Sequence, residues 1–357
     1  MAERVLTAPE LNRAVLARQL LLERSPLTPA RAVERVAGLQ TQYAPSGYVG
    51  LWSRLAGFRR ADLTDALLAG RVVQAWVMRC TIHMVSAAEY RPMTEAVRRP
   101  RRRLWVPPAG LDMARVVDAV RGYLAAGPLT QAELQRSLAA DGFPRDTWRG
   151  VQLFVDLVRV PPAGTWERPR AHVYGLADTW LRRAAPVTEE AGRELLAARY
   201  LRGFGPASAK DIGSFCGWNL TEVREVLARL ELRRFRDEAG GLLVDVPRAP
   251  LPPAATPAPV RFLGPWDATL LVHARRARIL PEAHRPRVFA TSMPQSVPTF
   301  LVDGQVAGTW RHTDGRVSWE AFDELRPAAR AEVDAEAERL GAELYGPDEV
   351  GATRRPG

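Results

Sequence analysis

Apolar residues recur at helical spacing through the first seventy residues of the chain and then give way to an alternating pattern. The apolar stripes predict helices that begin after Thr7, at Thr28 and near Ala61. Gly70 is expected to end the third helix. Residues 72–85 are rich in β-branched and aromatic side chains, which predicts one or two short strands. Three helices followed by a β-ribbon is the order of a winged helix.

The same order recurs twice further along the chain, because three amphipathic segments are again followed by an alternating one. The expected helices are 114–126, 131–140 and 145–158 in the second copy, and 189–202, 208–216 and 220–230 in the third. The ribbons are expected at 159–174 and 232–246. The ribbon of the third copy, at 232–246, is expected to turn at Ala239-Gly240-Gly241.

A proline-rich linker over 247–259 separates these copies from a C-terminal segment with short alternating runs. Asp303-Gly304 and Asp314-Gly315 are strong hairpin-turn signals between those runs. The expected strands are 297–302, 306–310 and 316–322, and the expected final helix is 327–344.

These patterns together predict an α+β protein of three tandem winged helix-turn-helix units with a C-terminal β-rich element. The expected divisions are 1–110, 111–186, 187–250 and 251–357. The last division holds the linker, the hairpin and the final helix.

Composition narrows the class of partner. The 357 residues carry a net charge of +10 and give a pI near 10.4, which favours nucleic acid over an anionic membrane surface. Lys210 is the only lysine, so arginine supplies nearly all of the positive charge. Arginine suits phosphates and guanine edges, although a high-GC codon bias would equally favour arginine over lysine.

Other counts predict an absence of cofactors and metals. Cys80 and Cys216 are far apart, and the five histidines lack metal-ligand spacing. The N-terminus has no apolar signal segment, and the apolar stretch 288–302 contains two prolines. We therefore expect a soluble, cytoplasmic protein without a structural metal.

Most catalytic signatures are missing from the sequence, including the nucleophile elbow, the Walker A loop and HExxH. Gly203-x-Gly205 superficially looks like a dinucleotide loop, but no strand precedes it and Pro206 follows. We interpret it as a turn between helices. His83 lies on a predicted strand and is interpreted as a buried structural histidine.

A family resemblance rests on several segments taken together. They are 39–42 (LQTQ) with Tyr43 and Pro45 after it, 78–85 (MRCTIHMV), Trp266-Asp267, and 302–310. The chain resembles the AlkZ-type DNA glycosylases, a winged-helix family, from about residue 5 to about residue 345. It departs from that family's usual MRGTLHLV ribbon at Cys80, where glycine is common.

The resemblance implies a concave DNA-binding surface scaffolded by three winged helices, two essential glutamines and a β-hairpin that probes the duplex. The glutamines correspond to Gln40 and Gln42. The hairpin corresponds to 306–319, with its tip at 312–315. Related family members carry aspartate at the second motif position, so Gln42 favours the AlkZ branch. That branch acts on azinomycin-type crosslinks in self-resistance and repair.

Two glutamine amides can supply hydrogen bonds to a glycosidase reaction but not acid–base catalysis. Glutamine does not titrate, so it cannot serve as a general acid or base. An N7-alkylated guanine already carries a positive charge and leaves without a proton. We therefore expect the amide oxygens of Gln40 and Gln42 to orient water and to stabilise a cationic sugar.

The position of the motif constrains its backbone. Residues two apart point to roughly opposite sides of a helix, so both glutamines can face one cleft only where the helix has ended. Pro45 disfavours helical Ala44 and predicts an irregular exit after Gly38 or Leu39. The alternative is a solvated helix end that carries two amides by chance.

Lys210 is far in sequence from the motif, which favours a monofunctional glycosylase over a glycosylase-lyase that uses an amine. DNA-contacting residues are expected in two arginine clusters and at the hairpin tip. They are Arg98, Arg99, Arg101, Arg102, Arg103, Arg275, Arg276, Arg311, His312, Thr313 and Arg316. A solvated loop is an equally good interpretation of the first cluster.

The expected partner is double-stranded DNA that contains N7-alkylguanine or an interstrand crosslink, bound by a monomer without a cofactor. A winged-helix transcriptional regulator is the alternative, and dimerisation on paired half-sites would identify it. A protein that sequesters the lesion without turnover shares every binding feature. No heptad seam or dimerisation helix is evident in the sequence.

Overall fold

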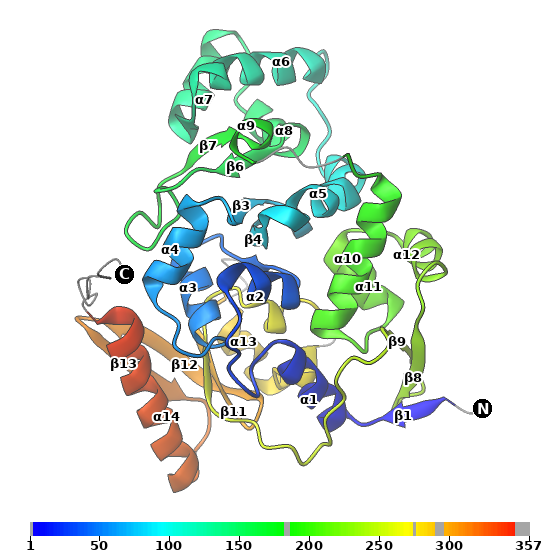
Figure 1. Cartoon of the computed structure of the whole chain (residues 1–357), viewed down its shortest axis with the longest axis vertical. Helices are drawn as coiled ribbons and strands as arrows, with labels where there is room; N and C mark the ends of the chain where they lie inside the picture. Colours follow the sequence, from blue (N-terminus) through cyan, green and yellow to red (C-terminus); the bar gives the residue numbers. More distant parts are fainter. Residues whose placement is uncertain (1–2, 182–185, 274–275, 290–295, 347–357) are drawn as a thin grey trace, which may run out of the picture.

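The computed structural model describes residues 3–181, 186–273, 276–289 and 296–346 (Figure 1). Its helices are α1 (Ala8–Arg18), α2 (Pro29–Arg35), α3 (Pro45–Trp52), α4 (Arg60–Leu68), α5 (Ala87–Arg102), α6 (Met113–Tyr123), α7 (Gln131–Ala140), α8 (Thr147–Phe154), α9 (Ala177–Trp180), α10 (Glu189–Phe204), α11 (Ala209–Cys216), α12 (Leu220–Leu227), α13 (Arg285–Val288) and α14 (Pro327–Leu340). Its strands are β1 (Arg4–Leu6), β2 (Leu39–Gln40), β3 (Val72–Trp76), β4 (Ile82–Ser86), β5 (Leu129–Thr130), β6 (Leu157–Arg159), β7 (Val173–Leu176), β8 (Arg233–Asp237), β9 (Leu242–Asp245), β10 (Arg261–Leu263), β11 (Thr299–Val302), β12 (Gln305–Thr313) and β13 (Arg316–Ala321). The α+β class expected from the sequence is confirmed.

The ribbons of the first two predicted units form one sheet. Its strand order is β2-β4-β3-β6-β7-β5, and the two units join where β3 pairs antiparallel with β6. Gln74 lies opposite Arg159 and Ala75 opposite Val158 at this junction. The continuous sheet crosses the middle of the molecule, between the upper helices α6 to α8 and the rest of the chain (Figure 1). The division between 110 and 111 stays a prediction.

The N-terminal strand β1 adds to the hairpin formed by β8 and β9. The hairpin of β8 and β9 carries β1 as a parallel third strand, with Arg4 opposite Phe235. The sequence analysis did not foresee this strand, since three residues are too few to show an alternating pattern. The start of the chain therefore folds with the unit expected at 187–250.

Local signals place several elements correctly. Thr130 and Asn219 form capping boxes at α7 and α12, and Thr188 accepts from the backbone of Ala191 at the start of α10. The helix expected over 145–158 is shorter than predicted, because α8 ends at Phe154. The chain then enters the sheet as β6, where Val158 is fully buried.

The C-terminal sheet has the order β10-β11-β12-β13 and is covered by α14, at the lower left in Figure 1. Both expected Asp-Gly turns are confirmed. Asp303 and Gly304 have φ angles of 48° and 78°, and Asp314 and Gly315 have 51° and 77°. Two successive positive φ angles are the geometry of a type I′ hairpin turn.

This sheet packs on the segment that follows the glutamine motif. Phe262, Phe300 and Trp310 of the sheet share one buried cluster with Tyr48 and Trp52 of α3. Arg54 and Asp267, both buried, add a bidentate ion pair with two bonds of 2.9 Å. The C-terminal element therefore fixes α3, and α3 in turn fixes the motif just before it.

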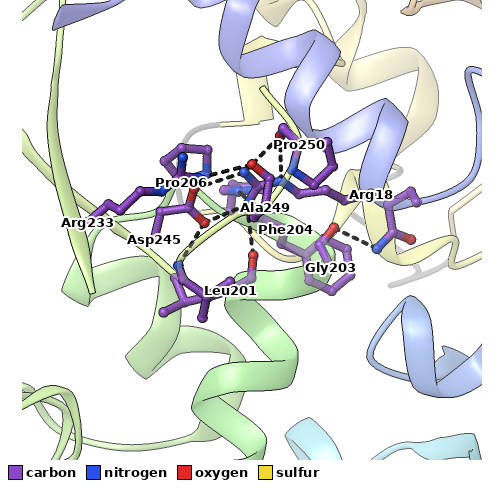
Figure 2. Close-up of polar contacts among 12 residues, drawn as sticks. Arg18, Leu201, Gly203, Phe204, Pro206, Arg233, Asp245, Ala249 and Pro250 are labelled. Carbon is purple, nitrogen blue, oxygen red and sulfur yellow. Dashed lines mark hydrogen bonds and ion pairs between the residues drawn. The ribbon is translucent and has the colours of Figure 1, made fainter. Parts of the chain in front are cut away.

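A second buried ion pair connects α1 to the end of β9 (Figure 2). The Arg18 guanidinium donates to both carboxylate oxygens of Asp245, at 2.7 and 2.9 Å, and both side chains are 0% exposed. Arg18 also donates to the backbone carbonyls of Leu201 and Pro250. Arg233 adds a third bond to Asp245, at 2.6 Å. The buried charges are thereby compensated.

The Gly203-x-Gly205 segment ends α10, which confirms that it is a turn between helices. A Cβ at Gly205 would lie 2.6 Å from the carbonyl oxygen of Leu201 and 2.7 Å from the Arg18 guanidinium. The glycine is needed there because the buried ion pair approaches the backbone closely.

Among the described residues, no helix is long and apolar enough to cross a membrane.

Candidate functional site

Gln40 ends the short strand β2 at the edge of the six-stranded sheet, and Gln42 lies just beyond that strand in a bend. β2 pairs antiparallel with β4, and the backbone amide of Thr41 continues the ladder with a 2.7 Å bond to the Ile82 carbonyl. The helix has ended before the motif, as expected, but earlier than predicted: α2 ends at Arg35 rather than at Gly38 or Leu39, and residues 39–40 form a strand. The amide oxygen of Gln40 accepts from Arg79 and that of Gln42 from Ile82, so both glutamines lie beside the segment 79–82.

One part of that expectation is wrong. Ala44 has φ −55° and ψ −42°, which is helical, and it precedes α3 directly. Pro45 therefore occupies the first position of a helix, where its missing N–H costs nothing. The motif connects a strand to a helix.

Gln40 is buried, 6% exposed, and its amide oxygen accepts a hydrogen bond from the guanidinium of Arg79. Arg79 lies in a 3₁₀ turn, Met78–Cys80, between β3 and β4 and has a φ of 51°. Its guanidinium also lies 5.6 Å from the ring centre of Phe215 on α11. Arginine only donates hydrogen bonds, so this contact fixes the orientation of the Gln40 amide.

Gln42 is exposed, and its amide oxygen accepts from the backbone N–H of Ile82 at 3.1 Å. A backbone N–H is also only a donor, so the orientation of this amide is fixed as well. Each carbonyl oxygen retains a second lone pair. The two side chains thus present ordered amides whose NH₂ groups are directed away from these contacts.

His83 lies directly opposite Gln40 in the β2–β4 ladder. It is 1% exposed, and its Nδ1–H donates to the carbonyl of Thr81 at 3.0 Å. Burial, together with the nearby charge of Arg79, lowers the pKa of His83 to about 3. The ring is therefore neutral at physiological pH.

Cys80 is the next residue of the same turn. Its φ of 54° lies in the left-handed region, which favours glycine. The thiol is half-buried, and burial raises its pKa. A raised pKa keeps the thiol protonated at neutral pH, so the sulfur is a packing group here.

The first arginine cluster is not a solvated loop, since it forms the last turns of α5. Arg98 forms ion pairs with Glu95 and Asp156. Arg101 is buried and donates to the carbonyl of Gln152. These two side chains are committed to the packing of α5 on the second unit, so we leave both out of the proposed DNA surface.

The other three arginines of the cluster are more accessible. Arg102 lies over the ring of Phe154, 4.6 Å from its centre. Arg99 and Arg103 are 65% and 50% exposed in their side chains, although they contact Glu189 and Glu222. Their contacts are on three other helices: Arg102 contacts α8, Arg99 contacts α10 and Arg103 contacts α12.

The second cluster is largely outside the described residues. Arg275 lies outside them, and only the backbone of Arg276 is described, as the start of a 3₁₀ turn.

The C-terminal hairpin presents most of its expected residues. Arg311, Thr313 and Arg316 are exposed around the turn at Asp314-Gly315. His312 differs, because its ring stacks on Tyr345 with 3.9 Å between ring centres, and burial lowers its pKa. The tip of the hairpin therefore carries polar and basic side chains, and His312 anchors it by stacking on Tyr345.

Sequence reasoning missed Arg79. The residue was part of a motif, but no role was assigned to it. The available signal was a cation within the short segment predicted to form the strands of the first ribbon. Its importance depends on the antiparallel pairing of β4 with both β2 and β3, which brings the turn beside Gln40.

The comparisons with known proteins agree with this architecture. The family model for AlkZ-like DNA glycosylases matches residues 33–342. The structure of the DNA glycosylase AlkZ from Streptomyces sahachiroi superposes with a TM-score of 0.78 at 19% sequence identity, covering 95% of this chain and 97% of that one. No curated protein sequence matches the chain. The extent of the family match, over the segment that contains both glutamines and the hairpin, shows that the chain belongs to the AlkZ-like family of DNA glycosylases.

Proposed function

We propose that this glycosylase hydrolyses the N-glycosidic bond of N7-alkylated purines in duplex DNA and unhooks azinomycin-type interstrand crosslinks. Repair and self-resistance would follow from that activity. The observation that carries the proposal is the chemistry around the motif. Among the described residues, Gln40, Gln42 and His83 bond to a guanidinium, a backbone amide and a backbone carbonyl rather than to a carboxylate.

Such a site suits a leaving group that is already cationic. When the bond between C1′ and N9 breaks, its electron pair moves to N9 and neutralises the charge of the N7-alkylated ring. No acid is required for that step. Ordered amides can hold water and face the developing positive charge on the sugar without reorganising during the reaction. An uncharged purine would need the general acid that these contacts do not supply.

We further propose that the enzyme is monofunctional. Lys210 is exposed on α11 and lines a hollow with Asp237 and Gly241 of the third hairpin. That hollow does not include Gln40 or Gln42. Release of the base by water, with an abasic site left behind, is the reaction that the motif supports.

The proposed DNA-binding residues are those that are exposed or only partly buried, on a protein that we propose to act as a monomer. They are Arg99, Arg102 and Arg103 at the end of α5, and Arg311, His312, Thr313 and Arg316 at the hairpin tip. Arginines of this kind neutralise phosphates and position the duplex without reading its sequence. A crosslink prevents the two DNA strands from separating fully. We propose that the hairpin tip enters between them where the duplex is partly opened.

The test is release of base by the wild-type protein, with duplex DNA in molar excess. Substrates are a duplex with N7-methylguanine, one with an azinomycin crosslink, and an unmodified duplex as control. More than one equivalent of released base per protein supports the proposal. Binding of both lesions without release would contradict it and favour a regulator or a sequestering protein. A stop at one equivalent would show hydrolysis followed by retention of the product on the protein.

The hairpin tip gives a separate prediction. In an Arg311→Ala/Arg316→Ala variant we expect weaker DNA binding and a shallower salt dependence, by about 0.9 in the slope of log K against log salt for each phosphate that the protein no longer neutralises. Fluorescence anisotropy at several salt concentrations measures that slope. Arg59→Ala is the matched control, since its side chain is 78% exposed and it caps α4. An unchanged slope in the double variant would remove the tip from the proposed interface.

A further inference from the structure

His83 is placed on the same face of the sheet as Gln40. The two residues lie directly opposite each other in an antiparallel ladder, and such pairs have Cβ atoms about 5 Å apart on one side of the sheet. Arg79 connects them. It donates to the amide of Gln40, and its charge also acts on the His83 ring.

One nitrogen of this ring has no partner. Nδ1 must carry the hydrogen, because the carbonyl of Thr81 that it contacts is only an acceptor. Nε2 therefore carries a lone pair. It is buried and accepts no hydrogen bond from any described residue. An unsatisfied buried acceptor is costly and rare in folded proteins, so it calls for an explanation.

The proposed reaction needs such an acceptor. A water molecule that attacks C1′ must turn its oxygen lone pair to the sugar, and its hydrogens must then point to acceptors. The amide oxygens of Gln40 and Gln42 are already directed at Arg79 and Ile82. The neutral Nε2 of His83 is an acceptor in this cluster that none of these contacts uses.

We propose that His83 is a catalytic residue whose Nε2 accepts a hydrogen bond from the attacking water and holds it beside Gln40. This inference rests on the proposed glycosylase reaction. The water oxygen forms the bond to C1′ as the bond to N9 breaks with its electron pair. The water then loses one proton through the Nε2 contact to solvent, which leaves a hydroxyl on the abasic sugar.

Access to Nε2 requires neighbouring groups to move, because the atom is buried in the free protein. Arg79, which donates to Gln40 and whose charge acts on the ring, is the group that we expect to move. DNA phosphates are strong partners for a guanidinium, and binding them would draw Arg79 away from Gln40. The same movement would free the amide oxygen of Gln40 to accept the second hydrogen of the water, while Nε2 accepts the first, and would remove a positive charge from the place where the sugar becomes cationic.

Two substitutions separate the two nitrogens of the ring. His83→Asn keeps an amide near the position of Nδ1, where it can donate to Thr81, but places nothing at Nε2. His83→Gln reaches the position of Nε2 with an amide oxygen that can accept. Single-turnover base release, DNA affinity and Tm are measured for both. His273→Asn, which removes another buried histidine, one that donates to the carbonyl of Phe204, is the control for the change in packing.

We expect release by His83→Asn to be slower than wild type by about 10- to 100-fold, the effect of removing one hydrogen bond from the transition state. DNA affinity should be unchanged. His83→Gln should recover most of the rate, and His273→Asn should match wild type at equal folded fraction. A wild-type rate in His83→Asn, or equal loss in both His83 variants, would overturn the inference. If wild type itself releases no base, the proposed function fails instead.

Discussion

Gln40→Ala and Gln42→Ala variants are each expected to slow single-turnover base release by on the order of 10²–10³-fold while binding DNA about as tightly as wild type. Loss of one preorganised dipole in an active site has an effect of that size. Gln40 accepts from Arg79 and Gln42 from the Ile82 backbone, so both amides are ordered before substrate binds. The rate constant at saturating protein, together with Kd, separates catalysis from binding.

Gln305→Ala is the matched control for these variants. Gln305 is exposed at the start of β12, at the opposite end of the strand from the hairpin tip. Its removal should leave the rate unchanged. The glutamines would be excluded as the reacting pair if both motif variants released N7-methylguanine at the wild-type rate. A rise in Kd without a change in the saturated rate would assign them to DNA binding.

Asp245→Ala should lower the free energy of unfolding by about 3–5 kcal/mol, because it leaves a buried charge uncompensated. Arg18 is 0% exposed and would keep only the backbone carbonyls of Leu201 and Pro250 as acceptors. The same substitution removes the partner of Arg233. The pair joins α1 to the end of β9, so the loss is expected to affect the whole cooperative transition.

Urea denaturation measures this difference, and two further variants interpret it. Arg18→Met/Asp245→Leu removes both charges and should be more stable than Asp245→Ala, since apolar groups of similar volume often replace a buried pair at little cost. Glu282→Ala breaks an exposed pair with Arg285 and should change stability by at most about 1 kcal/mol. A small loss in Asp245→Ala would show that water reaches Arg18.

Features set by neighbouring residues could be predicted from the sequence. The capping boxes at Thr130 and Asn219 depend on a residue three positions later. The turns at Asp303-Gly304 and Asp314-Gly315 depend on two residues that tolerate positive φ. Interactions this local are visible in one sequence, because the partner lies within the same few residues.

Features set by distant partners could not be predicted. β1 and β2 are three and two residues long, and pairing with β8 and β4 makes them strands. The arginines at the end of α5 show the same limit. Asp156 and Glu222, which contact Arg98 and Arg103, lie more than fifty residues away in sequence, so charge density alone indicated a nucleic-acid surface.

For the same reason, only part of the candidate site could be predicted from the sequence. Gln40 and Gln42 stood out as a motif, but Arg79 and His83 join them only through the ladder between β2 and β4. α3 was missed because Pro45 was interpreted as the end of a helical segment rather than the start of one. A proline permits both, and the packing of Tyr48 and Trp52 decides between them.

The junction between β3 and β6 limits how far this enzyme can be reduced. A chain cut after residue 110 would keep both glutamines but would lose β6, one of the two partners of β3, and β3 would then expose an open sheet edge prone to aggregation. Its first helix would also lose Asp245, and α3 would lose its cover. The segment that carries Gln40 and Gln42 is therefore not a portable module, and neither truncation nor transplantation should yield a minimal active fragment.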